Sequence, residues 1–200
     1  MSKVITTPKG KAVWPKVVTP DTKFDEEGMY SCKLHVSEGD FRSFEESIKP
    51  VIDAAYKAEC DRQGKAKIRL AASNPVRITD EGDFEIYAKQ KAKVHTKRSG
   101  TLEFSIAAVD STGAKLATMP NVGSGSALKM AVEVSTWFVA SQGFGYSLRL
   151  RAIQILDLVE MSGSSQSFGF GAEADGYVGS GESLNSAFEV ENEATTNVPF

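Results

Sequence analysis

The chain has 200 residues, of which 41% are hydrophobic and 24% charged, and its formal net charge at pH 7 is −3. This composition fits one folded domain with an appendage, and the absence of any apolar run of 18 or more residues excludes a membrane-spanning helix. Cys32 and Cys60 form no CxxC motif and have no clustered histidines. We therefore expect two reduced thiols, with no disulfide and no metal site.

The charge is distributed unequally along the chain. All 23 lysines and arginines lie in residues 1–151, together with 18 of the 26 acids, whereas residues 152–200 contain eight acids and no basic residue. The first part therefore carries a net charge of about +5 and the second about −8. A basic folded body suits a polyanion such as nucleic acid, and an acidic end suits basic proteins or the body itself.

The first forty residues have the pattern of β-strands. Residues 11–18 predict a strand, and Pro15 places it at a sheet edge or a strand end. A turn-rich stretch over residues 19–28 follows. Residues 30–36 then alternate apolar and polar side chains, which predicts a half-buried strand.

One helix is expected next. Apolar residues recur at spacings of three and four from Phe41 to Tyr56, between a cap at Ser37 or Asp40 and a stop at Gly64. Pro50 lies inside this pattern, so we expect a kink or two successive helices.

The remainder of the chain reads as strands followed by a tail. We expect a short strand over residues 68–70 and longer ones over 85–96, 102–110, 127–139 and 147–160, the last two joined by a hairpin loop. From Met161 the sequence is rich in Gly and Ser. The predicted fold is mainly β: an OB-fold-like β-barrel (residues 1–160) with one inserted helical segment, and a disordered acidic C-terminal tail (residues 161–200).

The strand over residues 85–96 indicates a binding face. Tyr87, Lys89, Lys91 and Lys93 alternate with smaller or apolar residues, so their side chains are predicted to point the same way. Lysines in register behind an aromatic ring suit a bound polyanion. The alternative is an edge strand whose lysines prevent aggregation.

Other aromatic and basic residues on predicted strands support the same hypothesis. Cations can follow phosphates while flat rings stack on bases, which is how proteins bind single strands without sequence preference. Taken individually, an aromatic residue on a strand is more often part of the core than a stacking platform, and it is the joint occurrence with basic residues that favours binding. The further candidates are Trp14, Lys16, Lys129, Trp137, Tyr146, Arg149 and Arg151.

Catalytic motifs are not found. The glycine-rich residues 123–129 lack the spacing of a P-loop and lead into a strand, and no serine or cysteine lies in a nucleophile motif. We therefore expect a protein that is not an enzyme and has no catalytic residue, no metal and no cofactor.

Residues 121–137 and 147–160 resemble the C-terminal half of the single-stranded DNA-binding proteins of T7-type podophages. Further matching features occur in the same order, namely Pro20-Asp21, residues 28–34, the helix after them, residues 176–178 and the terminal Phe200. The resemblance implies an OB-fold with a helix after the second strand and single-stranded DNA binding along the barrel. Lys129 and Trp137 fall where that family places a basic and an aromatic contact.

The resemblance also implies partners. In that family the acidic tail contacts the phage DNA polymerase and the helicase-primase, which assigns partner binding here to Glu189, Glu191, Glu193 and Phe200. The tail departs from the family in having only four acids over residues 182–200.

The predicted function is a phage-encoded protein that coats single-stranded DNA in the host cell cytoplasm. It would serve DNA replication, recombination and repair by recruiting other proteins through its tail. The sequence leaves open whether the chain forms a homodimer and whether it prefers DNA or RNA. The alternative is a β-rich virion or scaffold protein that binds no nucleic acid.

Overall fold

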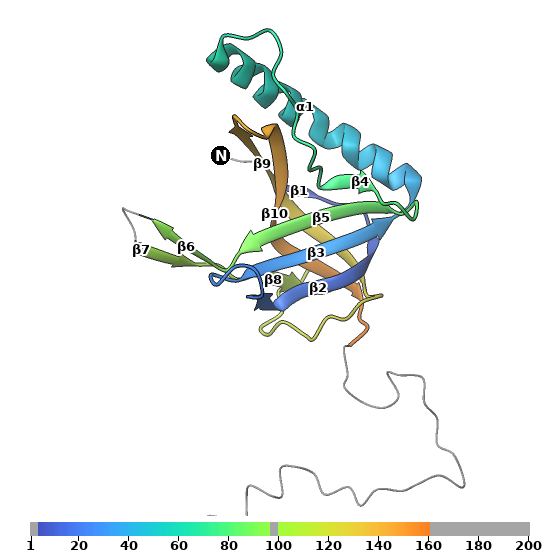
Figure 1. Cartoon of the computed structure of the whole chain (residues 1–200). Coiled ribbons are helices and arrows are strands. Elements are labelled where there is room, and N and C mark those ends of the chain that lie inside the picture. Colours follow the sequence, from blue (N-terminus) through green and yellow to red (C-terminus); the bar gives the residue numbers. More distant parts are fainter. Residues whose placement is uncertain (1–3, 97–99, 161–200) are drawn as a thin grey trace, which may run out of the picture. The chain divides into compact units, whose positions relative to one another are not determined.

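The computed structural model describes residues 4–96 and 100–160, which contain one helix and ten strands (Figure 1). The helix is α1 (Glu38–Gln63). The strands are β1 (Val4–Thr6), β2 (Gly10–Asp21), β3 (Met29–Val36), β4 (Val76–Ile78), β5 (Phe84–Lys91), β6 (Lys93–Thr96), β7 (Gly100–Glu103), β8 (Ala107–Val109), β9 (Ala127–Val139) and β10 (Gly143–Asp157). The predicted tail over residues 161–200 lies outside the described residues.

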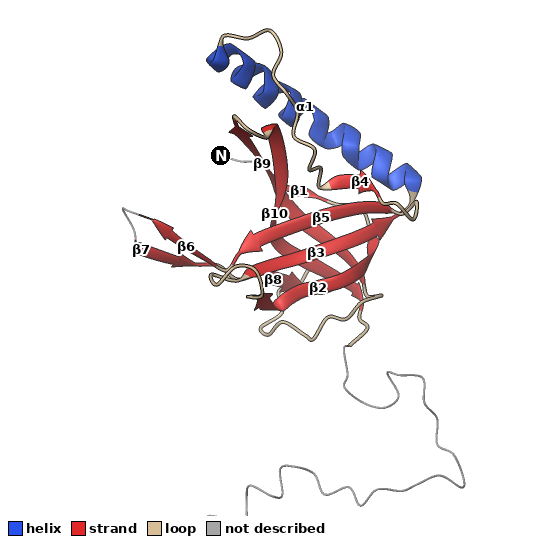
Figure 2. Ribbon diagram, viewed as in Figure 1, coloured by secondary structure: helices blue, strands red, loops and turns tan. Residues whose placement is uncertain are grey.

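Five of the strands close into a barrel (Figure 2). β2 pairs with β3 and β3 with β5, both antiparallel, and β5 then pairs parallel with β10. β10 pairs antiparallel with β9, and β9 returns to β2 and closes the ring. A five-stranded barrel of this connectivity is an OB-fold, so the predicted fold class is confirmed.

The β9–β10 hairpin is the longest pairing in the barrel. Its register runs from Val139 opposite Gly143 to Ala127 opposite Asp157, with a bulge at Arg151. Alternate side chains of both strands enter the core, where Met130 and Leu150 are fully buried. The bounds of β9 are those predicted, whereas β10 begins at Gly143, earlier than the predicted start at residue 147.

Helix α1 packs across one end of the barrel and follows β3, the second barrel strand, as the resemblance implied (Figure 1). Ser37 caps it by accepting a hydrogen bond from the Asp40 N–H at 3.2 Å, and Gly64 ends it with φ +62°. The expectation of two successive helices at Pro50 is wrong, because α1 is continuous through this exposed residue. Phe41, which contacts Phe84, and Tyr56, which contacts Phe144, hold the helix to the barrel on both sides of Pro50.

The predicted strand over residues 85–96 is two strands in different sheets. β5 belongs to the barrel and ends at Lys91, whereas β6 pairs with β7 in a separate two-stranded hairpin. Ala92 makes the transition, because its N–H donates to the Gly28 carbonyl at 2.8 Å and its own carbonyl accepts from the Phe104 N–H at 2.7 Å. The same contact ends β7, so the predicted strand over residues 102–110 is also two strands, β7 and β8.

Residues 68–70 do not form the predicted strand. Only Leu70 makes a bridge, to Phe144, while both backbone groups of Ile68 bond to the Tyr56 hydroxyl at 2.9 and 3.1 Å. Among the described residues, pairing with β10 is therefore limited to the hydrogen bonds of Phe144 with Arg69 and Ala71, and the Tyr56 side chain holds the residue before them.

Cys32 and Cys60 are free and buried, and burial raises the pKa of the Cys32 thiol to about 12. Within residues 4–96 and 100–160, no helix has the length and apolar character needed to cross a membrane. Over the same residues, no group of three or more His, Cys, Asp or Glu is arranged to hold a metal ion.

Candidate nucleic-acid interface

Two cavities adjoin on the outside of the barrel, over strands β5 and β10. The first, of about 340 Å³, is lined by Lys33, Ser73, Asn74, Pro75, Arg77, Tyr87, Lys89, Trp137, Tyr146, Ser147 and Leu148. The second, of about 450 Å³, is lined by Met29, Lys89, Gln90, Lys91, Val94, Phe104, Ser147, Arg149 and Arg151. Because Lys89 and Ser147 line both, the two cavities are neighbours, and we call them together the groove.

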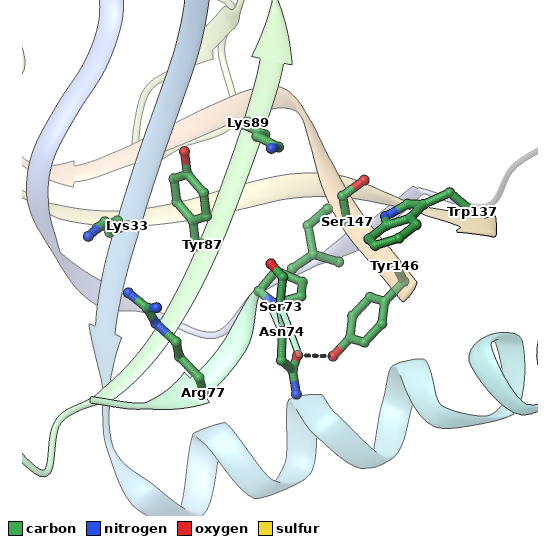
Figure 3. A pocket seen from close by; sticks show the side chains of 11 residues that line it. Lys33, Ser73, Asn74, Arg77, Tyr87, Lys89, Trp137, Tyr146 and Ser147 are labelled. Atoms are coloured by element: carbon green, nitrogen blue, oxygen red, sulfur yellow. Dashed lines mark hydrogen bonds between the residues drawn. The ribbon is translucent and has the colours of Figure 1, made fainter. Parts of the chain in front are cut away.

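Three aromatic side chains surround the first cavity (Figure 3). Trp137 comes from β9, Tyr146 from β10 and Tyr87 from β5. The Tyr146 hydroxyl donates to Asn74 Oδ1 at 2.6 Å, which fixes the ring, and burial raises the pKa of Tyr146 to about 12 with a further contribution from the Glu45 carboxylate. Burial likewise raises the pKa of Tyr87. Both phenols are therefore neutral at physiological pH and present uncharged rings to a ligand.

The Trp137 indole lies against the backbone of Gly145, its register partner on β10. A Cβ atom at position 145 would come within 2.4 Å of Trp137 Cζ2, a distance that real side chains essentially never show. Only glycine therefore allows the ring to lie flat at this edge of the cavity.

A cluster of charges lies beside Tyr87, around Glu85, which itself lines neither cavity. The Glu85 side chain is only 3% exposed, and its carboxylate meets Arg77 Nη2 at 2.9 Å and Lys33 Nζ at 3.4 Å. Lys33 Nζ also lies 5.9 Å from the centre of the Tyr87 ring. The buried carboxylate thus holds two cations in fixed positions at the cavity edge.

Lys33, Asn74 and Arg77 were not predicted as site residues. The sequence does indicate that Lys33 faces away from the core, since it alternates with buried residues on β3. Its place beside Tyr87 depends on the register between β3 and β5, in which Lys33 is opposite Tyr87. Asn74 and Arg77 lie on the segment between α1 and β5, and no periodicity in the sequence marks them.

Lys89 and Arg149 lie at the middle of the groove as register partners on β5 and β10. Both side chains are exposed, and over the described residues neither forms an ion pair. They are the cations best placed to meet an incoming phosphate.

The other predicted cations near the groove already have carboxylate partners. Lys91 Nζ lies 2.7 Å from Glu27 and 3.3 Å from Asp25, and these acids, Glu27 first, raise the pKa of Lys91. Arg151 meets Glu133 at 2.7 Å. A phosphate at either position would have to compete with a carboxylate.

Four predicted residues line neither cavity. Lys93 lies on the β6–β7 hairpin, where it pairs with Glu103 at 3.1 Å. Lys129 is half-buried on β9. Trp14, which is 75% exposed at φ +46°, sits at an irregularity of β2, and Lys16 lines a different cavity with Val122. The tail residues Glu189, Glu191, Glu193 and Phe200 lie outside the described residues.

Comparisons with known proteins bear on this fold. No protein-family model and no curated protein sequence matches the chain. Among solved structures, it is similar to gp2.5, a single-stranded DNA-binding protein encoded by bacteriophage T7, with a TM-score of 0.70, 22% identity and coverage of 90% of this chain and 100% of that chain. It is also similar to the single-stranded DNA-binding protein from bacteriophage Enc34, with a TM-score of 0.50, 12% identity and coverage of 81% and 86%. The chain therefore has the fold of these phage proteins, and the predicted resemblance is confirmed at that level.

Proposed function

We propose that this chain is a non-enzymatic protein that binds single-stranded DNA in the groove. The observation that carries the proposal is the exposed pair Lys89 and Arg149. Lys89 lines both the cavity with three aromatic rings and the second cavity, and Arg149 lines the second. The likeness in fold to two phage single-stranded DNA-binding proteins supports it.

In the proposed complex, a strand lies across β5 and β10. Bases stack against Trp137, Tyr87 and Tyr146, and phosphates meet Lys89 and Arg149. Stacking on a flat ring is open to every base, so binding is tolerant of sequence. The ion pairs of Lys91 and Arg151 weaken in the complex as phosphates compete with Glu27, Asp25 and Glu133. Trp14, Lys16, Lys93 and Lys129 serve a longer strand that extends beyond the groove.

The acidic tail adds a second activity to this proposal. Glu189, Glu191 and Glu193, with Phe200, recruit the DNA polymerase and helicase-primase of the phage in the host cytoplasm, in support of replication, recombination and repair. The sequence supports this with a charge of about −8 over residues 152–200 and an aromatic residue at position 200. Truncation after Gly181 is expected to abolish recruitment, and Phe200→Ala to reduce it without changing DNA affinity.

A salt titration of oligo-dT binding tests the central proposal. If about four or five cations meet phosphates, log K falls with log salt at a slope near −3, because a single strand releases about 0.7 counterion per contact. A slope indistinguishable from zero would contradict the proposal and favour a β-rich virion or scaffold protein. Competition between oligo-dT and oligo-U of equal length measures the preference for DNA over RNA.

A further inference from the structure

The second cavity contains apolar side chains that the strand-by-strand pattern of lysines does not suggest. Met29, Val94 and Phe104 line it together with Lys89, Lys91, Arg149 and Arg151. Its volume of about 450 Å³ exceeds the 340 Å³ of the aromatic cavity. Apolar side chains grouped with several cations in one cavity are unusual on a surface that binds no ligand.

Backbone contacts fix this apolar wall in place. Met29 begins β3, Val94 lies on β6, and Phe104 follows β7. Ala92 ties these elements together, because it donates to the carbonyl of Gly28, next to Met29, and accepts from the N–H of Phe104. The Phe104 backbone is thus held by the same residue that separates β5 from β6.

Gln90 lines the cavity without offering its side chain to a ligand. It follows the buried positions Ile86 and Ala88 on β5, whereas Lys89 and Lys91 are exposed on the other side of the strand. Its Nε2 donates to the Lys91 carbonyl at 3.0 Å, and its Oε1 is buried. Recognition of a ligand in this cavity therefore depends on the apolar wall and the cations.

A nucleobase has the chemistry that this cavity would take. It has flat apolar faces, and phosphates flank it on both sides. We propose that the second cavity is a nucleobase subsite in which Phe104 is the stacking ring, Met29 and Val94 complete the apolar wall, and Lys89 and Arg149 hold the neighbouring phosphates. The inference rests on the proposed single-strand binding and adds a second base position, separate from the rings of Trp137, Tyr87 and Tyr146.

Phe104→Leu is the variant that tests the subsite, because leucine keeps the wall apolar and removes the ring. We expect it to weaken binding of an oligo-dT of about 12 nucleotides about tenfold, with the salt slope and the melting temperature unchanged, since stacking releases no counterion. Phe24→Ala is the matched control, because Phe24 is 90% exposed, lines neither cavity and should leave affinity within about twofold.

A double-mutant cycle separates the two base positions. If Phe104 and Trp137 contact different bases, the effects of Phe104→Leu and Trp137→Ala on binding add. Equal affinity for Phe104→Leu and the unchanged protein, with the effect of Trp137→Ala intact, overturns the subsite and leaves the proposed function standing. Failure of the unchanged protein to bind oligo-dT overturns both.

Discussion

Lys89 on β5 and Arg149 on β10 are register partners in the barrel, and neither has a carboxylate partner among the described residues. Like charges on neighbouring strands repel each other, and among the described residues no ion pair of either side chain offsets this repulsion. The pair therefore contributes unfavourably to folding and favourably to binding an anion.

Replacing both residues with methionine, which keeps the apolar stems, should separate these two effects. We expect the melting temperature to stay level or rise, while the slope of log K against log salt for oligo-dT becomes less negative by about 1.4. Lys57→Met on the exposed face of α1 is the control, and it should leave the slope unchanged. An unaltered slope in the double variant would mean that the strand avoids the middle of the groove.

The contact of Trp137 with Gly145 allows a second test. Trp137→Ala should weaken oligo-dT binding by about 1–3 kcal/mol without changing the salt slope. Gly145→Ala should also weaken binding, because a Cβ atom 2.4 Å from Trp137 Cζ2 forces the ring to move. In the Trp137→Ala background, Gly145→Ala should have no further effect on affinity, as measured by fluorescence titration. If the melting temperature of Trp137→Ala collapses instead, Trp137 belongs to the core.

The carboxylate partners of Lys91 lead to a prediction that a substitution strengthens DNA binding. Glu27→Gln removes the acid closest to Lys91 Nζ, at 2.7 Å, and leaves Asp25, at 3.3 Å, so a phosphate competes with one carboxylate in place of two. Affinity for oligo-dT at low salt should rise, and the salt slope should steepen by up to about 0.7. Glu26→Gln makes the same change of charge in the same loop without a contact to Lys91, so it isolates the ion pair from the net charge. Equal gains in the two variants would indicate a general charge effect.

Tyr146 should make stability depend on alkaline pH. Burial raises its pKa from the ordinary 10.0 of a tyrosine to about 12 in the folded protein, so the folded state holds this proton more tightly than the unfolded state. The resulting contribution to the free energy of unfolding is complete below pH 10 and is lost as the pH rises from 10 to about 12. Denaturant unfolding of the unchanged protein and of Tyr146→Phe measures it, and their difference should shrink across this window. A constant difference would show that burial does not favour the neutral phenol.

The elements that the sequence predicted well are those in which apolar residues recur at a regular spacing without interruption. The apolar positions of α1 and the alternation on β3 and β9 are set by contact with one core, so their residue types report burial directly. The continuity of α1 through Pro50 could not be read in this way, because it depends on packing at Phe41 and Tyr56 against distant strands.

The split at Ala92 was missed for a different reason. Alternation continues across it, with Lys91 and Lys93 exposed on either side, although the two lysines belong to different sheets. The hydrogen bonds that cause the split come from Gly28 and Phe104, which are remote in sequence. Cross-strand register, which brings Lys33 to Tyr87 and Lys89 to Arg149, is likewise a property of the folded barrel.

The β9–β10 hairpin closes the barrel and also supplies Trp137, Tyr146, Arg149 and Arg151 to the groove. Core strands such as these open less often than loops and termini, and their amide protons exchange with solvent more slowly. We therefore expect the interface to be as rigid as the core, so that a strand binds to a surface that is already in its final shape. Little chain entropy is then lost on the protein side, and most of the ordering falls on the nucleic acid.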